Sequence, residues 1–174
     1  LILQMIKELK DILTLLKSNS EIRLLCITGS GNVFSSGADL DWMKKARNLN
    51  LKENKLDALN FTGLLKQIDC FPKPTIAIIN GHAFGGGLGI IAACDYSIAC
   101  SEAKFSFSEV KLGIIPAMIA PYIIRNIGYK KAKSLFLTGE VFNTTKAMKI
   151  ELIDYNVDKS EVENIKNTLI KKLL

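Results

Sequence analysis

The sequence predicts an α/β fold in one domain, and three observations support this prediction. Amphipathic helical patterns alternate with short apolar runs, so that helix, turn and strand recur along the chain. Of the 174 residues, 48% are hydrophobic and 23% are charged, which suits a single globular domain with a sizeable core. No internal repeat or low-complexity linker divides the chain.

The first helix–strand unit occupies residues 2–28. Its apolar residues are spaced alternately four and three apart, which predicts an amphipathic helix. These residues are Ile2, Ile6, Leu9, Leu13 and Leu16. The polar run 18–20 ends this helix, and the apolar run 22–28 predicts a buried strand.

The same alternation continues to the end of the chain. Residues 39–67 indicate a helix with a break near residues 48–50, and residues 71–74 must be extended because proline disfavours helix in the residue before it. Further strands are predicted at 75–79, 96–100 and 104–107. Helices are predicted at 88–94, 122–127, 130–137 and 144–150, and a capping box from Ser160 to Glu163 predicts the start of a last helix.

Cysteine, histidine and charge usage argue against several classes of site. The cysteines lie mostly in apolar runs without a CxxC pair, and His82 is the single histidine, so we predict no metal and reduced thiols in an intracellular, cytoplasmic protein. The four are Cys26, Cys70, Cys94 and Cys100. The net charge of +6 comes from dispersed lysines, which predicts solvated helix faces or attraction of a polyanionic small ligand. We expect no nucleic acid partner, because no basic cluster is interleaved with aromatic residues.

Two uncharged stretches are long enough to raise the question of a membrane span. The interval from Pro74 to Cys94 contains Asn80, His82 and five glycines, and residues 113–124 are too few and contain two prolines. We therefore predict no transmembrane segment. The N-terminus lacks a signal-peptide cleavage pattern and a methionine, and it opens directly in a helical pattern, which suggests a fragment.

The stretch HAFGGGLGI, residues 82–90, places four glycines in five consecutive positions between apolar runs. It lacks the lysine and the spacing of a Walker phosphate loop, and its GGGxG order differs from the dinucleotide-binding GxGxxG. A serine hydrolase is not favoured either, because Ser36 lacks the GxSxG frame and the only histidine stands inside the glycine loop itself.

Three glycines before a helix can expose backbone N–H groups to a ligand. The start of the helix adds partial positive charge there, and two such N–H groups can hold a carbonyl oxygen that gains negative charge in a transition state. Close packing of the helix against a strand explains the same glycines. The glycine pattern alone leaves both interpretations open.

Four stretches carry a family resemblance, and they occur in order along nearly the whole chain. They are FSSGADL (34–40), KPTIAIINGHAFGGGLGI (73–90), CDYSIACSEAKFSFSEVKLGIIP (94–116) and LTGEVF (137–142). Together they resemble the crotonase family of enoyl-CoA hydratases and isomerases. The strings SEVKLGIIPAMIAPYI and GADLDWM are most similar to its methylglutaconyl-CoA and carboxygeranoyl-CoA hydratase branch.

The resemblance implies a crotonase-like spiral of ββα units with a helical C-terminal part. It implies that residues 1–174 form one domain, which lacks the N-terminal strands and C-terminal helices of the full-length family. It also implies an acyl-CoA substrate whose thioester enolate is stabilised, and a homotrimer or hexamer. Coenzyme A is part of the substrate, so no separate cofactor is expected.

Site residues follow from the resemblance position by position. The backbone N–H groups of Ala38 and Gly86 correspond to the oxyanion hole, and Glu109 corresponds to a catalytic acid/base. The substrate-binding candidates are Ser36, Gly37, Asp39, Leu40, His82, Phe84, Gly85 and Gly113. The basic residues Lys44, Lys45 and Arg47 either attract the nucleotide phosphates or form a solvated helix face.

One residue departs from the hydratase pattern of the family. Hydratases of this family carry a first glutamate three residues after the middle glycine, and this position is Gly89 here. Enoyl-CoA hydration remains our interpretation, with Glu109 serving both proton transfers or a second group assisting. The alternatives are a double-bond isomerase that uses Glu109 alone and a catalytically weak acyl-CoA-binding protein. For Asp95 we favour a helix N-cap or a salt bridge, and for His82 a partly buried structural role over lining of the acyl pocket.

Overall fold

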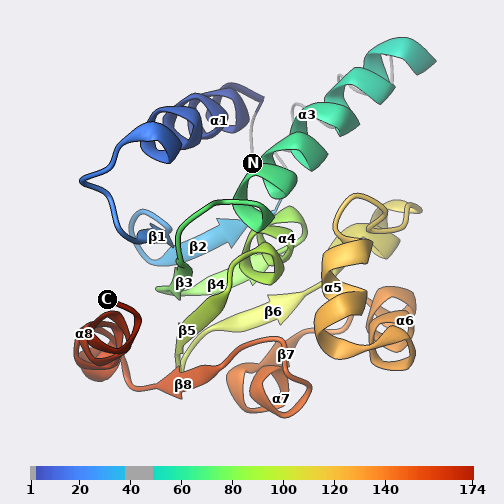
Figure 1. Ribbon diagram of the computed structural model, residues 1–174. Helices are drawn as coiled ribbons and strands as arrows, with labels where there is room; N and C mark the ends of the chain where they lie inside the picture. The colour runs from blue at the N-terminus through green and yellow to red at the C-terminus, as the bar shows by residue number, and fades with distance from the viewer. Residues whose placement is uncertain (1–2, 38–48) are drawn as a thin grey trace.

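The computed structural model describes residues 3–37 and 49–174 (Figure 1). The helices are α1 (Leu3–Ser18), α3 (Leu51–Asp69), α4 (Gly86–Ala93), α5 (Ala120–Ile127), α6 (Tyr129–Thr138), α7 (Thr144–Lys149) and α8 (Val162–Leu173), with short 3-10 helices η1 (Ser108–Leu112) and η2 (Lys159–Glu161). The strands are β1 (Leu25–Thr28), β2 (Val33–Ser36), β3 (Thr75–Ile79), β4 (His82–Phe84), β5 (Tyr96–Cys100), β6 (Lys104–Ser106), β7 (Phe142–Asn143) and β8 (Tyr155–Val157). The predicted α/β class is therefore observed.

The strands form two four-stranded sheets, and from β1 to β6 successive strands belong alternately to one sheet and to the other. One sheet has the order β1-β3-β5-β8, with every pair parallel. The other has the order β2-β4-β6-β7, in which only the β6–β7 pair is antiparallel. From β1 to β6 each turn of the chain adds one strand to each sheet before a helix follows, as in β3-β4-α4, whereas α7 (Thr144–Lys149) separates β7 from β8 in the last turn. This is the spiral of ββα units that the sequence resemblance implies.

The strands of the first sheet are tied together by repeated side-chain hydrogen bonds. Asp95 Oδ2 accepts bonds from the Thr75 amide and from the Thr75 hydroxyl, each 2.8 Å long. One strand further along, Asp154 Oδ2 accepts the same pair of bonds from Ser97. The helix N-cap and the salt bridge that we favoured for Asp95 are both wrong. Within residues 3–37 and 49–174, the Asp95 carboxylate accepts hydrogen bonds from Thr75 at the start of β3 instead.

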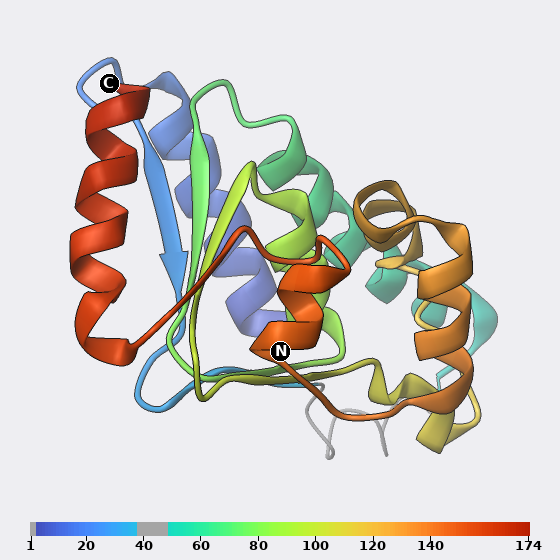
Figure 2. The ribbon, with the colours of Figure 1, turned by 90° about the horizontal axis from the view of Figure 1, so that it is seen from below.

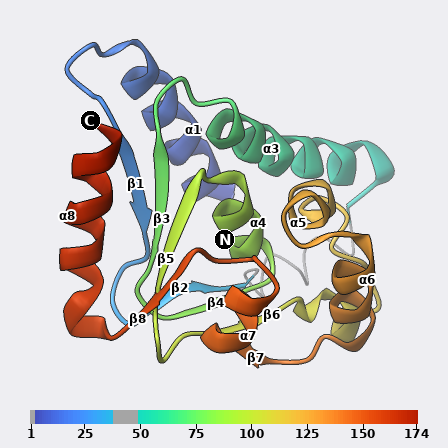
Figure 3. The ribbon, with the colours of Figure 1, turned by 60° about the horizontal axis from the view of Figure 1, so that its bottom comes forward.

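Helix α4 lies at the centre of the molecule and brings the glycine loop to the site. Its residues Gly87 to Ala93 are all buried, so it is apolar on every side. Figure 3 shows α4 among α3, α5 and the two sheets, while α8 covers the opposite face of the first sheet. Figure 2 shows the same arrangement from below, with α8 at the outer face of β1, β3 and β5. Enclosure from all sides explains why α4 lacks polar side chains.

Several element boundaries differ from the sequence prediction. Strands β2, β4, β7 and β8 were not predicted, because two to four residues carry little periodicity and these strands depend on pairing with their neighbours. Helix α4 begins at Gly86, earlier than residue 88. The predicted capping box is wrong: α8 begins after Glu161 without a side-chain cap, and Ser160 lies in η2.

The break predicted near residues 48–50 coincides with the start of α3. The Asn50 side chain accepts a bond from the Glu53 amide, and the Glu53 carboxylate accepts one from the Asn50 amide, which forms a complete capping box. No helix within the described part of the chain combines the length and apolar character needed to cross a bilayer.

Candidate active site

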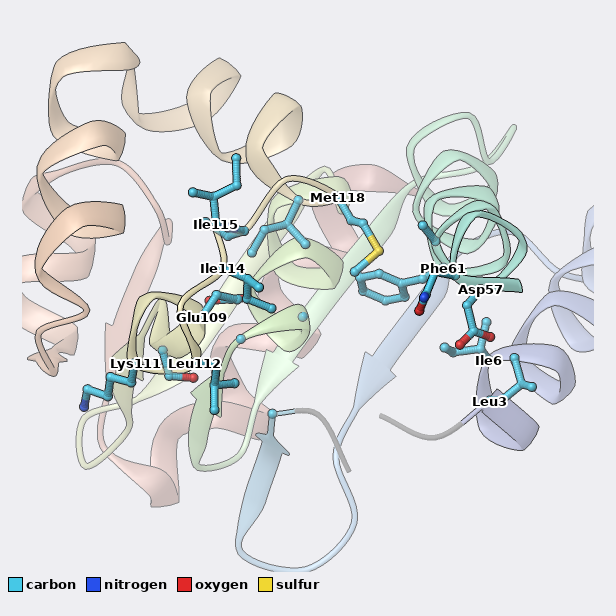
Figure 4. Close-up of a pocket in the computed structure, with 18 of the residues that line it drawn as sticks. Leu3, Ile6, Asp57, Phe61, Glu109, Lys111, Leu112, Ile114, Ile115 and Met118 are labelled. Carbon is cyan, nitrogen blue, oxygen red and sulfur yellow. The ribbon is translucent and has the colours of Figure 1, made fainter. Parts of the chain in front are cut away.

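A pocket of about 420 Å³ lies where the glycine loop, η1 and α3 meet (Figure 4). One wall comes from η1 and the loop after it, and the facing wall comes from α1 and α3. The lining residues are Leu3, Ile6, Ser36, Gly37, Asn54, Asp57, Ala58, Phe61, Gly85, Gly86, Ser108, Glu109, Lys111, Leu112, Ile114, Ile115, Pro116, Met118 and Ile119. The walls are mostly apolar, so the few polar groups stand out as candidates for chemistry.

Glu109 lies in η1, directly after β6, and its position is set by the packing beneath it. Phe105 and Phe107 are fully buried and anchor the chain on either side of Ser106. Gly113 ends η1 in the left-handed conformation at φ 74°, where its N–H donates to the Val110 carbonyl. A buried strand and a glycine cap thus hold one turn of helix at the rim of the pocket.

The carboxylate of Glu109 is a candidate proton-transfer group. Its Oε2 atom is buried and has no hydrogen-bond partner among the described residues. Burial of this carboxyl group raises its pKa, because desolvation disfavours the charged form. A raised pKa brings the carboxyl closer to neutral pH, where it can both accept and donate a proton.

Gly85 brings the glycine loop to within contact distance of Glu109. It adopts φ 55° and ψ −128°, a conformation that glycine tolerates and other residues rarely adopt. Its amide donates to the Ser106 carbonyl at 3.0 Å. A Cβ atom on Gly85 would lie 3.5 Å from Glu109 Oε1 and 3.6 Å from Gly37 Cα. The structure therefore brings together Gly37, Gly85 and Glu109, which the sequence resemblance had proposed for one site.

The other two glycines of the triple serve different purposes. Gly86 lines the pocket as the first residue of α4, where its N–H has no acceptor within the helix and carries partial positive charge. A Cβ atom on Gly87 would lie 2.4 Å from Ser35 Cβ, so Gly87 allows α4 to approach β2 closely. Packing thus explains Gly87, while Gly86 offers a donor to a ligand in the pocket.

The remaining predicted site residues divide into three groups. Ser36 lines the pocket at the end of β2. His82, Phe84 and Gly113 are not among the lining residues. Ala38, Asp39 and Leu40, together with Lys44, Lys45 and Arg47, lie outside the described residues.

His82 has a structural partner instead of a position in the pocket wall. Its Nδ1 atom accepts a hydrogen bond from the Lys104 amide at 3.2 Å, which links β4 to the start of β6. Its ring stacks on Phe84 with the centroids 6.0 Å apart. This arrangement matches the structural role that we favoured for His82.

Ile119 occupies the space beside Gly89. A Cβ atom on Gly89 would lie 2.3 Å from Ile119 Cγ2 and 2.9 Å from Ile119 Cβ, far below the ~3.5–4.0 Å of ordinary carbon contacts. Ile119 is 2% exposed and lines the pocket. The position of the first family glutamate is therefore filled by a neighbouring methyl group.

Sequence reasoning missed the wall contributed by α3. Asp57 and Phe61 are four residues apart and lie on the same helix face. Asp57 Oδ2 is buried and has no hydrogen-bond partner within the described ranges. The signal was available, because the spacing from Asp57 through Phe61 to the buried Leu64 and Ile68 follows one helical face.

Comparisons with known proteins agree with this geometry. A family model described as "Enoyl-CoA hydratase/isomerase" matches residues 1–174. The chain belongs to the enoyl-CoA hydratase/isomerase family. Its structure is similar to that of an enoyl-CoA hydratase from Shewanella pealeana, with a TM-score of 0.94 and 39% identity over 97% of this chain and 63% of that one. The fold is thus the crotonase fold.

Two curated members of the enoyl-CoA hydratase/isomerase family illustrate its range. A crotonyl-CoA hydratase from Syntrophomonas wolfei is 36% identical over 157 residues, which are 89% of this chain and 59% of that protein. An enoyl-CoA isomerase/hydratase from Mycosarcoma maydis is 40% identical over 138 residues, 76% of this chain and 48% of that protein. The chain spans from 55% to 64% of the length of three curated relatives, the S. wolfei hydratase among them.

Proposed function

We propose that the protein is an enoyl-CoA hydratase of the crotonase type, acting on an acyl-CoA thioester in fatty-acid or branched-chain acyl-CoA breakdown. The observation that carries this proposal is the Glu109 carboxylate, which is buried without a hydrogen-bond partner among the described residues and lies beside the glycine loop. Family membership and hydratases among the relatives support the same chemistry.

In this mechanism the Gly86 N–H donates to the thioester carbonyl oxygen, and the N–H of Ala38 is the second proposed donor. Glu109 takes a proton from water as the water oxygen bonds to the β-carbon, and the electron pair of the double bond moves to form the enolate. The protonated Glu109 then delivers that proton to the α-carbon. Each backbone N–H donor to the thioester oxygen contributes roughly 100–1000-fold to the rate, because negative charge on that oxygen grows in the transition state.

Double-bond isomerisation is the second candidate, and the filled space at Gly89 favours it. Isomerisation of a 3-enoyl-CoA needs one group to remove a proton from the α-carbon and return it to the γ-carbon while the double bond shifts. Glu109 alone suffices for this sequence of steps. The M. maydis relative is named as an enoyl-CoA isomerase/hydratase, which combines both activities.

The finer features of the proposal come from the sequence resemblance. The strings at residues 37–43 and 108–123 support a substrate of the methylglutaconyl-CoA or carboxygeranoyl-CoA kind. We further propose a homotrimer or hexamer in the cytoplasm that needs no cofactor apart from the coenzyme A of its substrate.

The test compares the full-length protein with its Glu109→Gln variant on 2-enoyl-CoA and 3-enoyl-CoA thioesters of several chain lengths. We expect turnover by the unsubstituted protein and a loss of about 100–10,000-fold in the variant, since glutamine keeps the shape but cannot carry the proton. Product formed from the 2-enoyl series shows hydration, and conjugated product from the 3-enoyl series shows isomerisation. Tight acyl-CoA binding without turnover would instead favour a binding protein, and an equal rate in the variant would remove Glu109 from the mechanism.

A further inference from the structure

The wall of the pocket is apolar where Gly89 of α4 meets Ile119, the residue that precedes α5. Gly89 lies three residues after Gly86 on α4, so the two residues share the helix face that borders the site. Ile119 precedes α5 and packs onto this face. The contact joins two segments that are thirty residues apart in the sequence.

The contact leaves no room for any side chain at position 89. Rotation of Ile119 cannot relieve the overlap, because its Cβ atom is itself 2.9 Å from the Cβ position of Gly89. Leu65 Cδ1 closes the remaining side at 3.3 Å. The backbone of Ile119 is held by hydrogen bonds, since its amide donates to the Pro116 carbonyl and its carbonyl accepts from the Ile123 amide.

We propose that Ile119 is a specificity-determining residue, which sets the ratio of hydration to isomerisation by occupying the space that a side chain at position 89 would need. This inference rests on the proposed function and deepens it. With Ile119 in place, the wall beside Gly89 presents a methyl group instead of a proton-transfer group, and proton transfer is left to Glu109 in the proposed mechanism. Double-bond isomerisation moves one proton and suits this arrangement, whereas hydration gains from a second group that holds the attacking water.

The experiment uses the full-length protein and a matched pair of double variants. Gly89→Glu/Ile119→Gly makes room for a carboxylate at this wall, because glycine removes both the Cγ2 and the Cβ atom of residue 119. Gly89→Ala/Ile119→Gly makes the same room without the carboxylate. We expect the ratio of kcat/KM for hydration to kcat/KM for isomerisation to be about 100-fold higher or more in the glutamate variant, the size of effect of one positioned proton-transfer group. Equal ratios in two folded variants would overturn the proposal.

A thermal-unfolding cycle tests the packing step independently of activity. Gly89→Ala alone is expected to lower Tm by about 2–12 °C through overpacking. Combined with Ile119→Gly, the loss should be smaller than the sum of the two single losses, because glycine removes both overlapping atoms of residue 119 and frees the space. Strictly additive losses would show that Ile119 does not exclude a side chain at position 89. If the unsubstituted protein converts neither enoyl-CoA series, the proposed function fails, and the cycle still reports on the packing.

Discussion

Replacing Gly85 with alanine adds one methyl group at the centre of the candidate site, and its effect can be worked out from the geometry. The backbone at φ 55° and ψ −128° is sparsely populated by residues with a Cβ atom, which costs about 1–3 kcal/mol. The reduced entropy of the unfolded chain offsets about 0.4–1 kcal/mol of this. The nearest atoms to the new methyl, Glu109 Oε1 at 3.5 Å and Gly37 Cα at 3.6 Å, are at ordinary contact distances and add no steric cost.

We therefore expect Gly85→Ala to lose about 1–2 kcal/mol, which lowers Tm by about 2–8 °C in a chain of this size. The methyl group also occupies space between Glu109 and Gly37 where the thioester would lie. We expect kcat/KM for enoyl-CoA to fall by about 100-fold, the effect of roughly 1 Å of misplacement. Thermal unfolding and steady-state kinetics on the same preparation measure both quantities.

Gly31→Ala is the matched control for this substitution. Gly31 also has a positive φ, at 70°, but no heavy atom lies within 4 Å of its Cβ position. It lies between β1 and β2, away from the lining of the pocket. We expect a comparable fall in Tm and unchanged kcat/KM. If both variants lose the same activity, the space beside Gly85 is not used by the substrate and the reasoning is refuted.

Two further predictions concern stability. Burial raises the pKa of Glu109 above the ~4.3 of an unfolded chain, so the protonated carboxyl favours the folded state fully below about pH 4.3, and this contribution is lost as pH rises through the folded-state pKa. The Tm of Glu109→Gln minus the Tm of the unsubstituted protein should therefore increase with pH across this window. A difference in Tm that stays constant with pH would contradict the burial argument. Thr75→Val removes the hydroxyl that donates to Asp95 Oδ2 at 2.8 Å and accepts from the Asp95 amide at 2.9 Å. It should cost about 1–3 kcal/mol in urea unfolding while kcat/KM is retained, and an unchanged stability would show that these bonds do not support the strand start.

The longer elements could be predicted because their local pattern agrees with their burial. Residues 75–79 are an uninterrupted apolar run, and they form a fully buried strand between β1 and β5. The spacing of apolar residues in the first helix places Ile6 and Leu13 on the buried side of α1. In both cases the type of element and its buried side follow from apolar residues that are adjacent or three to four positions apart, so no knowledge of distant partners is needed.

Short elements and caps were predicted less well, because their partners are far away in the sequence. Strand β4 has only three residues and is stabilised by pairing with β2 and β6. The capping box expected at Ser160 follows the sequence pattern, yet the chain continues as η2 and α8 begins after Glu161. At this helix start the turn of η2 takes the place of the expected side-chain cap.

The α/β class, the family resemblance and the candidate pair of Gly86 and Glu109 follow from the sequence alone, because they depend on short strings of residues. Only the tertiary structure showed that Ile119 fills the space beside Gly89 and that Asp57 lines the same pocket. These contacts arise only when α3 and the start of α5 pack onto α4. Which side chains then meet depends on how whole helices are placed, and no local periodicity specifies that placement.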